Sequence, residues 1–242
     1  MRFYRVRVVR TMPHPERGFT QGLIVSGGTV WESSGQYGIS ALRRYPLGAP
    51  KAATSVPLRA ELFAEGICPV AGDIWQLTWR ERVALRWDAR TLELTDRVPF
   101  NREGWGICAA GDFVMTSDGS SELVRRDRVT LTPLEVVVVH CAGHRITGLN
   151  DLAWSGGLVW ANVLARPFLA GIDPDSGEVV EVADARRADE RHWGDPNAVM
   201  NGIAAMPGAG EFLLTGKGWR HSYHVRLMPS RSHRDPVRLL TG

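Results

Sequence analysis

The sequence predicts an all-β protein, a five-bladed β-propeller with four-stranded antiparallel blades, from three observations. Short apolar runs recur along the 242 residues, separated by Gly, Pro and Asp turns, and long amphipathic helical patterns are missing. A strand–turn–strand segment recurs at spacings of roughly 40 to 50 residues, which is the period of a propeller blade. Each copy is followed by two more strand-like stretches, with turn signals such as Asp88-Ala89-Arg90-Thr91.

The predicted blades share one pattern: an apolar strand, a tight turn that contains Gly, Asp or Pro, and a second apolar strand. The copies of this hairpin cover residues 22–31, 66–75, 106–114, 151–160 and 202–214. The N-terminal run 3–9 precedes the first copy and has no hairpin of its own. We expect it to supply the outer strand of the last blade and so close the ring, which leaves no open sheet edge.

Two segments stand apart from the repeats. Residues 183–199 form the one polar, charged excursion, and we interpret them as a loop between the fourth and fifth blades. The tail 229–242 is arginine-rich and lacks an apolar pattern, so we expect it to be frayed. Residues 1–228 are accordingly predicted to form a single propeller domain.

Composition and charge exclude several classes of protein. The chain is 44% hydrophobic and 23% charged, which is typical of a globular protein, and no run of about 18 apolar residues could cross a bilayer. The 29 basic and 26 acidic residues give a net charge of +3, too balanced to indicate a nucleic-acid partner. No apolar signal segment is visible among residues 1–10, so the default expectation is a cytoplasmic monomer without a membrane partner.

Metal chemistry has little support in the sequence. The three cysteines lack CxxC spacing and are best interpreted as small buried hydrophobic residues. The seven histidines are not tied to a carboxylate motif at ligand spacing. We therefore expect no zinc site and no cofactor.

The repeat alignment places a set of polar and aromatic residues at one mouth of the ring. A blade's first strand runs antiparallel to its second, so the start of one and the end of the other lie at the same face. The residues just before the repeats are Gln21, Glu65, Trp105, Asn150 and Asn201. Those at the end of the second strands are Gly35, Trp79, Asp118, Leu164 and Lys217. Convergent polar groups with aromatic walls are typical of a small-molecule site.

Each of these residues also has a purely structural interpretation. Glu65 could pair with a rim arginine, and Lys217, one of only two lysines, could be a solvated turn residue. The indoles could pack between blades, and the asparagines could bond backbone. Asp118 lies in Ser117-Asp118-Gly119-Ser120 and is better explained as a turn former than as a catalytic group. The functional interpretation rests on these residues together, because all of them are predicted to lie at one face of the ring.

A series of short motifs runs in order through residues 3–227. It includes Gly18-Phe19-Thr20-Gln21-Gly22, Phe63-Ala64-Glu65-Gly66, Gln76-Leu77-Thr78-Trp79, Glu103-Gly104-Trp105-Gly106, Leu149-Asn150-Asp151-Leu152, Asn201-Gly202-Ile203-Ala204 and Thr215-Gly216-Lys217. Each motif alone is weak, but the ordered series is specific. It resembles the plant-type glutaminyl cyclases, or glutaminyl-peptide cyclotransferases, of plants and bacteria.

The resemblance implies a five-bladed propeller that converts the N-terminal glutamine of a peptide or protein to pyroglutamate and releases ammonia without a catalytic metal. The resemblance also allows a structural cation such as calcium in the channel. Carried over by motif, the site includes Phe19, Gln21, Glu65, Trp79, Trp105, Asn150 and Lys217. Two departures are visible: Leu164 stands where the family has tryptophan, and Asp151 where it usually has glutamate.

The chemistry assigns a role to each residue type. Glu65 is predicted to take a proton from the α-amine and give it to the leaving nitrogen. Lys217 and the amides of Gln21 and Asn150 are expected to stabilise the oxyanion or orient the γ-amide. The substrate-binding residues would be Phe19, Trp79, Trp105 and Asn201.

Two alternatives to this reaction remain open at this point. One is a non-catalytic propeller that binds a peptide terminus or a partner protein, which the loss of the family tryptophan at Leu164 keeps in view. The other is a calcium-dependent lactonase. A lactonase needs a carboxylate-rich channel, for which only Glu65, Asp118 and Asp151 are candidates.

Overall fold

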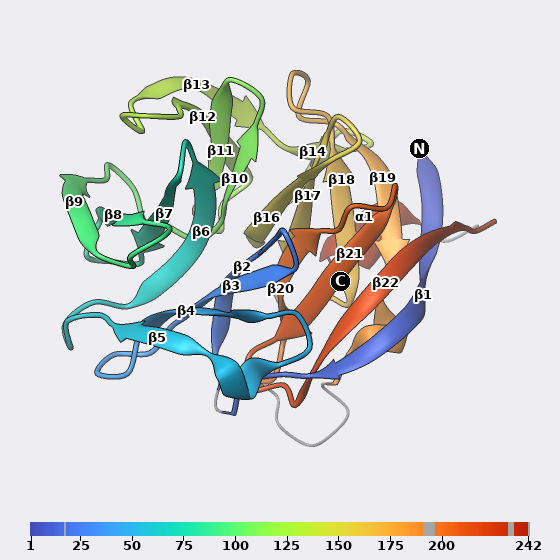
Figure 1. Cartoon of the computed structure of the whole chain (residues 1–242). Helices are drawn as coiled ribbons and strands as arrows, with labels where there is room; N and C mark the ends of the chain where they lie inside the picture. The colour runs from blue at the N-terminus through green and yellow to red at the C-terminus, as the bar shows by residue number, and fades with distance from the viewer. Residues whose placement is uncertain (17, 191–196, 232–234, 242) are drawn as a thin grey trace.

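The computed structural model describes residues 1–16, 18–190, 197–231 and 235–241, and the chain is all-β, as predicted (Figure 1). Its first three sheets are separate four-stranded antiparallel meanders. The first holds β2 (Thr20–Ser26), β3 (Thr29–Ser34), β4 (Ala41–Pro46) and β5 (Thr54–Pro57). The second holds β6 (Ala64–Val70), β7 (Asp73–Thr78), β8 (Val83–Asp88) and β9 (Leu94–Pro99). The third holds β10 (Ile107–Ala110), β11 (Phe113–Ser117), β12 (Glu122–Asp127) and β13 (Pro133–Val138).

Eight further strands form one sheet in the order β16-β17-β18-β19-β1-β22-β21-β20. One half is β16 (Leu149–Ser155), β17 (Leu158–Val163), β18 (Phe168–Ile172) and β19 (Val179–Asp184). The other half is β20 (Met200–Ala205), β21 (Glu211–Gly216), β22 (His221–Pro229) and the N-terminal strand β1 (Arg2–Pro13). The chain thus begins and ends its strands within the same sheet.

Strand β1 takes the place expected from the sequence, antiparallel to β22 (Figure 1). It is twelve residues long, and its first residues, Arg2 to Arg5, also pair in parallel with β19. The sequence did not predict this second pairing, which joins the last two meanders into one sheet. Without this pairing, β19 would leave its backbone N–H and C=O groups unpaired at an open sheet edge. The first residues of β1, which extend beyond β22, cover that edge.

Aspartates close the outer turns at the predicted positions. Asp88 Oδ1 accepts the amides of Arg90 and Thr91 at 2.9 and 2.7 Å, and Asp173 Oδ1 accepts those of Asp175 and Ser176 at 3.1 and 2.9 Å. Such side-chain bonds to the backbone two and three residues on favour a turn over a continued strand. The turn signals in the sequence are therefore confirmed in these two loops.

The segments outside the meanders are short. Strands β14 (His140–Cys141) and β15 (His144–Arg145) form a small ribbon, and 3₁₀ turns occupy Pro50–Ala52 and Arg186–Ala188. The first two residues of the predicted loop 183–199 belong instead to β19, which runs to Asp184, and residues 191–196 lie outside the described part of the chain. In the tail, helix α1 (Pro236–Thr241) places Leu240 in the core cluster between the third sheet and strands β16–β19. This packing ties down the described end of a segment that the sequence predicted to be frayed.

The first strands of successive meanders contact one another in turn, β2 with β6, β6 with β10, β10 with β16, β16 with β20, and β20 with β2. Glycines permit this approach: the Gly66 amide donates to the Trp105 carbonyl at 2.7 Å, and a Cβ on Gly106 would lie 2.1 Å from the Asn150 carbonyl oxygen. Glu65 and Trp105 directly precede these glycines, and Gln21 and Asn150 lie at the starts of β2 and β16. The close backbone contact therefore gathers them around one centre.

Replacing Gly106 by alanine tests that contact. We expect Gly106→Ala to lose about 1–3 kcal/mol of unfolding free energy, because the new methyl group meets a backbone oxygen that cannot move aside cheaply. Gly111→Asn is the control, since Gly111 has φ +66° and open space around it, a conformation that asparagine tolerates. Thermal unfolding measures both, and equal melting temperatures would contradict the packing argument.

Candidate functional site

A pocket of about 320 Å³ opens where the first strands of the meanders begin. It is lined by Phe19, Gln21, Phe63, Glu65, Trp79, Trp105, Asn150, Leu164 and Lys217. Every residue predicted to be catalytic is in this lining, and so are the predicted substrate-binding residues apart from Asn201. Residues from all parts of the chain thus meet in one cavity, as the repeat alignment requires.

Strand ends position these side chains. Gln21, Glu65 and Asn150 lie at the starts of β2, β6 and β16, whereas Trp79 and Lys217 follow the ends of β7 and β21. Since β6 and β7 are antiparallel partners, Glu65 and Trp79 reach the same end of the sheet. Phe19 joins Lys217 through an isolated antiparallel bridge, which holds the aromatic ring beside the ammonium group.

Glu65 is buried and held by an amide chain. Gln21 Nε2 donates to Glu65 Oε1 at 2.9 Å, and Asn201 Nδ2 donates to Gln21 Oε1 at 2.9 Å. This chain fixes which way the Gln21 amide faces. Asn201 is fully buried behind Gln21 and also donates to the Thr20 carbonyl at 3.1 Å, so it orients a pocket residue rather than lining the pocket as predicted.

Burial dominates the electrostatics of Glu65 and Lys217. Loss of solvent raises the pKa of Glu65 well above its usual range, the cation of Lys217 opposes this, and the charges of Asp151, Glu81 and Glu103 add to it. Burial also lowers the pKa of Lys217, against the attraction of Glu65. A carboxyl with a raised pKa can both accept and donate a proton near neutrality.

Aromatic rings form the walls. The Phe63 ring lies 5.4 Å from that of Trp79 and 6.4 Å from that of Phe19, and the Lys217 ammonium lies 5.1 Å over the Phe19 ring. Sequence reasoning did not select Phe63 as a site residue. It stands two positions before Glu65, as Phe19 stands two before Gln21. This shared spacing could have identified Phe63 as a pocket residue.

Asp118 is a turn residue, which is the interpretation that the sequence favoured. Its Oδ1 accepts the Ser120 amide at 3.0 Å and the Ser120 hydroxyl at 2.5 Å, and Arg102 donates to Oδ2 at 3.0 Å. It does not line the pocket. Leu164 does line the pocket and is 37% exposed. The rim is therefore aliphatic at the position where the family that the motifs resemble has tryptophan.

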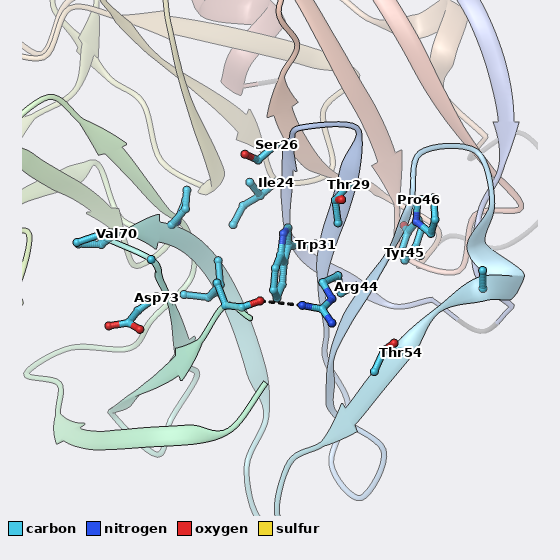
Figure 2. A pocket seen from close by; sticks show the side chains of 16 residues that line it. Ile24, Ser26, Thr29, Trp31, Arg44, Tyr45, Pro46, Thr54, Val70 and Asp73 are labelled. Atoms are coloured by element: carbon cyan, nitrogen blue, oxygen red, sulfur yellow. Dashed lines mark hydrogen bonds between the residues drawn. The ribbon is translucent and has the colours of Figure 1, made fainter. Parts of the chain in front are cut away.

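A second pocket, of about 630 Å³, lies between the first two sheets at the opposite ends of their strands, beside Ser26 and Val70 (Figure 2). Its charged side chains are already engaged: Arg44 Nη1 donates to the Ala89 carbonyl at 2.8 Å, and Asp73 accepts from Arg86 Nε at 2.6 Å. It contains none of the predicted site residues. The first pocket is therefore the candidate site.

Comparison with known proteins identifies the family. The model of the glutamine cyclotransferase family matches residues 1–227. A glutaminyl-peptide cyclotransferase from Arabidopsis thaliana is 30% identical over 233 residues, which are 93% of this chain and 72% of that protein. The chain belongs to the glutamine cyclotransferase family. The crystal structure of a glutaminyl cyclase from Myxococcus xanthus matches with a TM-score of 0.88 and 30% identity, covering 95% of this chain and 99% of that one.

The glutamine cyclotransferase family was predicted from the ordered motifs, and that prediction is confirmed. The described residues contain no group of three or more His, Cys, Asp or Glu side chains placed to hold a metal ion. The three cysteines are buried and free, as expected for small hydrophobic residues. No helix in the described part of the chain is long and apolar enough to span a membrane.

A buried ion pair lies behind the pocket of this cyclotransferase. The Thr20 hydroxyl donates to Glu32 Oε1 at 2.9 Å and lies 3.1 Å from His14 Nε2, while His14 Nδ1 lies 3.0 Å from the Trp219 carbonyl. A carbonyl only accepts, and the hydroxyl proton is given to Glu32, so both ring nitrogens of His14 must donate. His14 is therefore an imidazolium paired with the Glu32 carboxylate, and it ties the segment before Phe19 to the one after Lys217.

The His14–Glu32 pair predicts a pH-dependent stability. Burial favours the neutral form of His14 and so lowers its pKa. The charge and hydrogen bond of Glu32, together with the hydrogen bond to the Trp219 carbonyl, outweigh burial and raise the pKa of His14 above its usual value of 6.5. A raised pKa means stability that is complete below the unfolded value and is lost as pH rises through the folded value. We expect the melting-temperature advantage of wild type over His14→Gln to shrink as pH rises above neutrality. His144→Gln, at an exposed histidine, is the control, and an advantage that stays constant would contradict the assignment.

Proposed function

We propose that the pocket around Glu65 is the active site of a glutaminyl-peptide cyclotransferase, which converts N-terminal glutamine of peptides or proteins to pyroglutamate and releases ammonia. The observation that carries the proposal is a buried carboxylate, Glu65, and a half-buried lysine, Lys217, in one aromatic pocket, on motifs of the family. No step requires a metal or an organic cofactor, so we propose that the chain uses neither in catalysis.

The reaction is an intramolecular acyl transfer. The neutral α-amine of the substrate attacks its own γ-carbonyl carbon, a C–N bond forms, and the carbonyl oxygen becomes an oxyanion. Glu65 takes the proton from the attacking nitrogen and gives it to the γ-amide nitrogen, whose C–N bond then breaks as ammonia leaves. One carboxyl performs both transfers because the two nitrogens are bonded to the same carbon in the intermediate.

The oxyanion and the amide need partners. The Lys217 ammonium and the second N–H of the Gln21 amide are the donors proposed for the oxyanion, and one such donor is typically worth about 10²–10³ in rate. Asn150 Oδ1 has no hydrogen-bond partner in the described part of the chain. We propose that it accepts an N–H of the substrate and so orients the reacting nitrogen.

The aromatic walls hold the substrate's stem. Trp79, Trp105, Phe19 and Phe63 would enclose the methylene groups of the glutamine side chain and keep them folded, with the amine near the carbonyl carbon. Because both reacting groups belong to one residue, conformational restriction and exclusion of water are the main tasks of these walls. Leu164 would leave this rim more open than a tryptophan does.

We also propose a five-bladed propeller of residues 1–228 that acts as a monomer. The cyclic contacts of the first strands and the four-strand repeats support this architecture, in which the eight-stranded sheet is two blades joined by β1. All residues that line the pocket come from one chain, so no second copy is needed to complete it.

Incubation with a Gln-initiated dipeptide tests the function directly. We expect stoichiometric release of ammonia and a product lighter than the substrate by one ammonia molecule in mass spectrometry. The activity should persist in EDTA. Absence of product, or an EDTA-inactivated enzyme that zinc restores, would overturn the proposal.

A further inference from the structure

A carboxylate outside the pocket joins two of its walls. Glu103 Oε2 accepts the indole N–H of Trp79 at 2.9 Å and lies 3.4 Å from that of Trp105. An indole nitrogen can only donate, so each ring needs an acceptor at this point. Glu103 does not line the pocket, and its side chain is 35% exposed. One oxygen atom thus links two rings that come from different sheets.

Both indoles are also held from behind. The Arg80 guanidinium stacks 4.0 Å from the centre of the Trp79 ring, and its Nε lies 4.0 Å from Glu103 Oε1. A Cβ on Gly119 would lie 2.6 Å from the Trp105 ring, so Gly119 leaves room for that indole. Each ring is therefore fixed at its nitrogen by Glu103 and supported by a further residue.

Glu103 occupies a repeat position at which the first two meanders carry an aromatic residue. It stands two positions before Trp105, where the first and second meanders carry the pocket residues Phe19 and Phe63. In those meanders the position contributes a wall. In the third meander it contributes the acceptor that holds two walls.

We propose that Glu103 is a positioning residue for ring closure, acting through the indoles of Trp79 and Trp105 without touching the substrate. The inference rests on the proposed active site. A fixed pair of walls keeps the glutamine stem in the folded geometry, and a misplacement of about 1 Å can cost about 10²-fold in rate. Two hydrogen bonds to one charged acceptor are stronger and stiffer than bonds to water.

The charge of Glu103 has a separate effect. Together with burial and the charges of Asp151 and Glu81, it contributes to the raised pKa of Glu65. Glu103→Gln removes the charge but keeps an acceptor oxygen, so it should shift the acid limb of the kcat profile to lower pH while preserving more of the rate than alanine does. The two variants therefore separate the positional effect from the electrostatic one.

Steady-state kinetics on a Gln-initiated dipeptide test the inference. We expect Glu103→Ala to lower kcat/KM by about 10- to 100-fold, Glu103→Gln to recover much of that loss, and Glu135→Ala, an exposed carboxylate on β13, to have no effect. In ¹H–¹⁵N spectra, Glu103→Ala should move the indole N–H signals of Trp79 and Trp105, which Trp79→Phe and Trp105→Phe assign. Unmoved signals or wild-type kinetics would overturn the inference.

A double-mutant cycle shows whether Glu103 acts through the rings. In a Trp79→Phe/Trp105→Phe background, Glu103→Ala should cause no further loss, because the bonds that it makes are already gone. An equal loss in both backgrounds would overturn the inference and leave the active-site proposal intact. A Trp79→Phe/Trp105→Phe enzyme as active as wild type would likewise overturn the inference, because the indole N–H groups that Glu103 holds would then not matter. Failure of the wild-type chain to form product would instead overturn the active-site proposal.

Discussion

Glu65→Gln is expected to fold normally and to lose about 10²- to 10⁴-fold in kcat, the range that general acid–base catalysis contributes. The glutamine side chain has the same shape and can still accept the hydrogen bond from Gln21 Nε2. It cannot take the proton from the attacking amine or return it to the leaving nitrogen. Ammonia release from a Gln-initiated dipeptide measures the effect, with Glu178→Gln, at an exposed carboxylate, as the control.

The stability of Glu65→Gln should move in the opposite direction from its activity. A carboxyl whose folded pKa lies above its unfolded value of 4.5 costs the fold progressively more as pH rises toward the folded pKa. The variant has no such charge, so its melting temperature should equal or exceed that of wild type, with a margin that grows with pH. Wild-type turnover in this variant would remove Glu65 from the mechanism.

Most of the pocket could be predicted because the repeat fixes which residues begin and end each strand. Gln21, Glu65, Trp105 and Asn150 were found from their place before a repeat, and Lys217 from its place at the end of a second strand. Position along a strand follows from the period of the repeat and needs no knowledge of side-chain contacts.

The parts that the sequence missed depend on contacts between distant segments. Asn201 has the same register as Gln21, yet its amide turns inward to bond the side chain of Gln21 and the backbone of Thr20. The strand pairing shifts at Asn201 as it does at Gln21 and Glu65, so the backbone does not set Asn201 apart. The difference lies in the side-chain partners that the neighbouring first strand presents, which the hydrophobic pattern does not show.

The sheet arrangement was missed for a similar reason. A run of alternating residues predicts β1 and its antiparallel partner, but the parallel pairing of Arg2 to Arg5 with β19 depends on how far the strand projects past β22. Glu103 shows the same limit within the site. Its motif was visible, whereas its bonds to indoles from two sheets were not.

Lys217→Met is expected to lower kcat by about 10²- to 10³-fold, the usual loss for one oxyanion donor, while the protein stays folded. Methionine keeps the apolar stem of the side chain beside the Phe19 ring. Burial lowers the pKa of Lys217, so the charged form costs the fold stability below that pKa, and removing it should leave the melting temperature at least as high at neutral pH.

The pH profile of Lys217→Met distinguishes a catalytic lysine from a packing residue. The Lys217 cation opposes the raised pKa of Glu65, so its removal should raise that pKa further and shift the acid limb of kcat to higher pH. Glu103→Gln should shift the same limb to lower pH, because it removes an anion instead. Opposite shifts in the two variants require both charges to act on one carboxylate, whereas an unshifted limb in Lys217→Met would separate Lys217 from Glu65 and leave the oxyanion without its proposed cation.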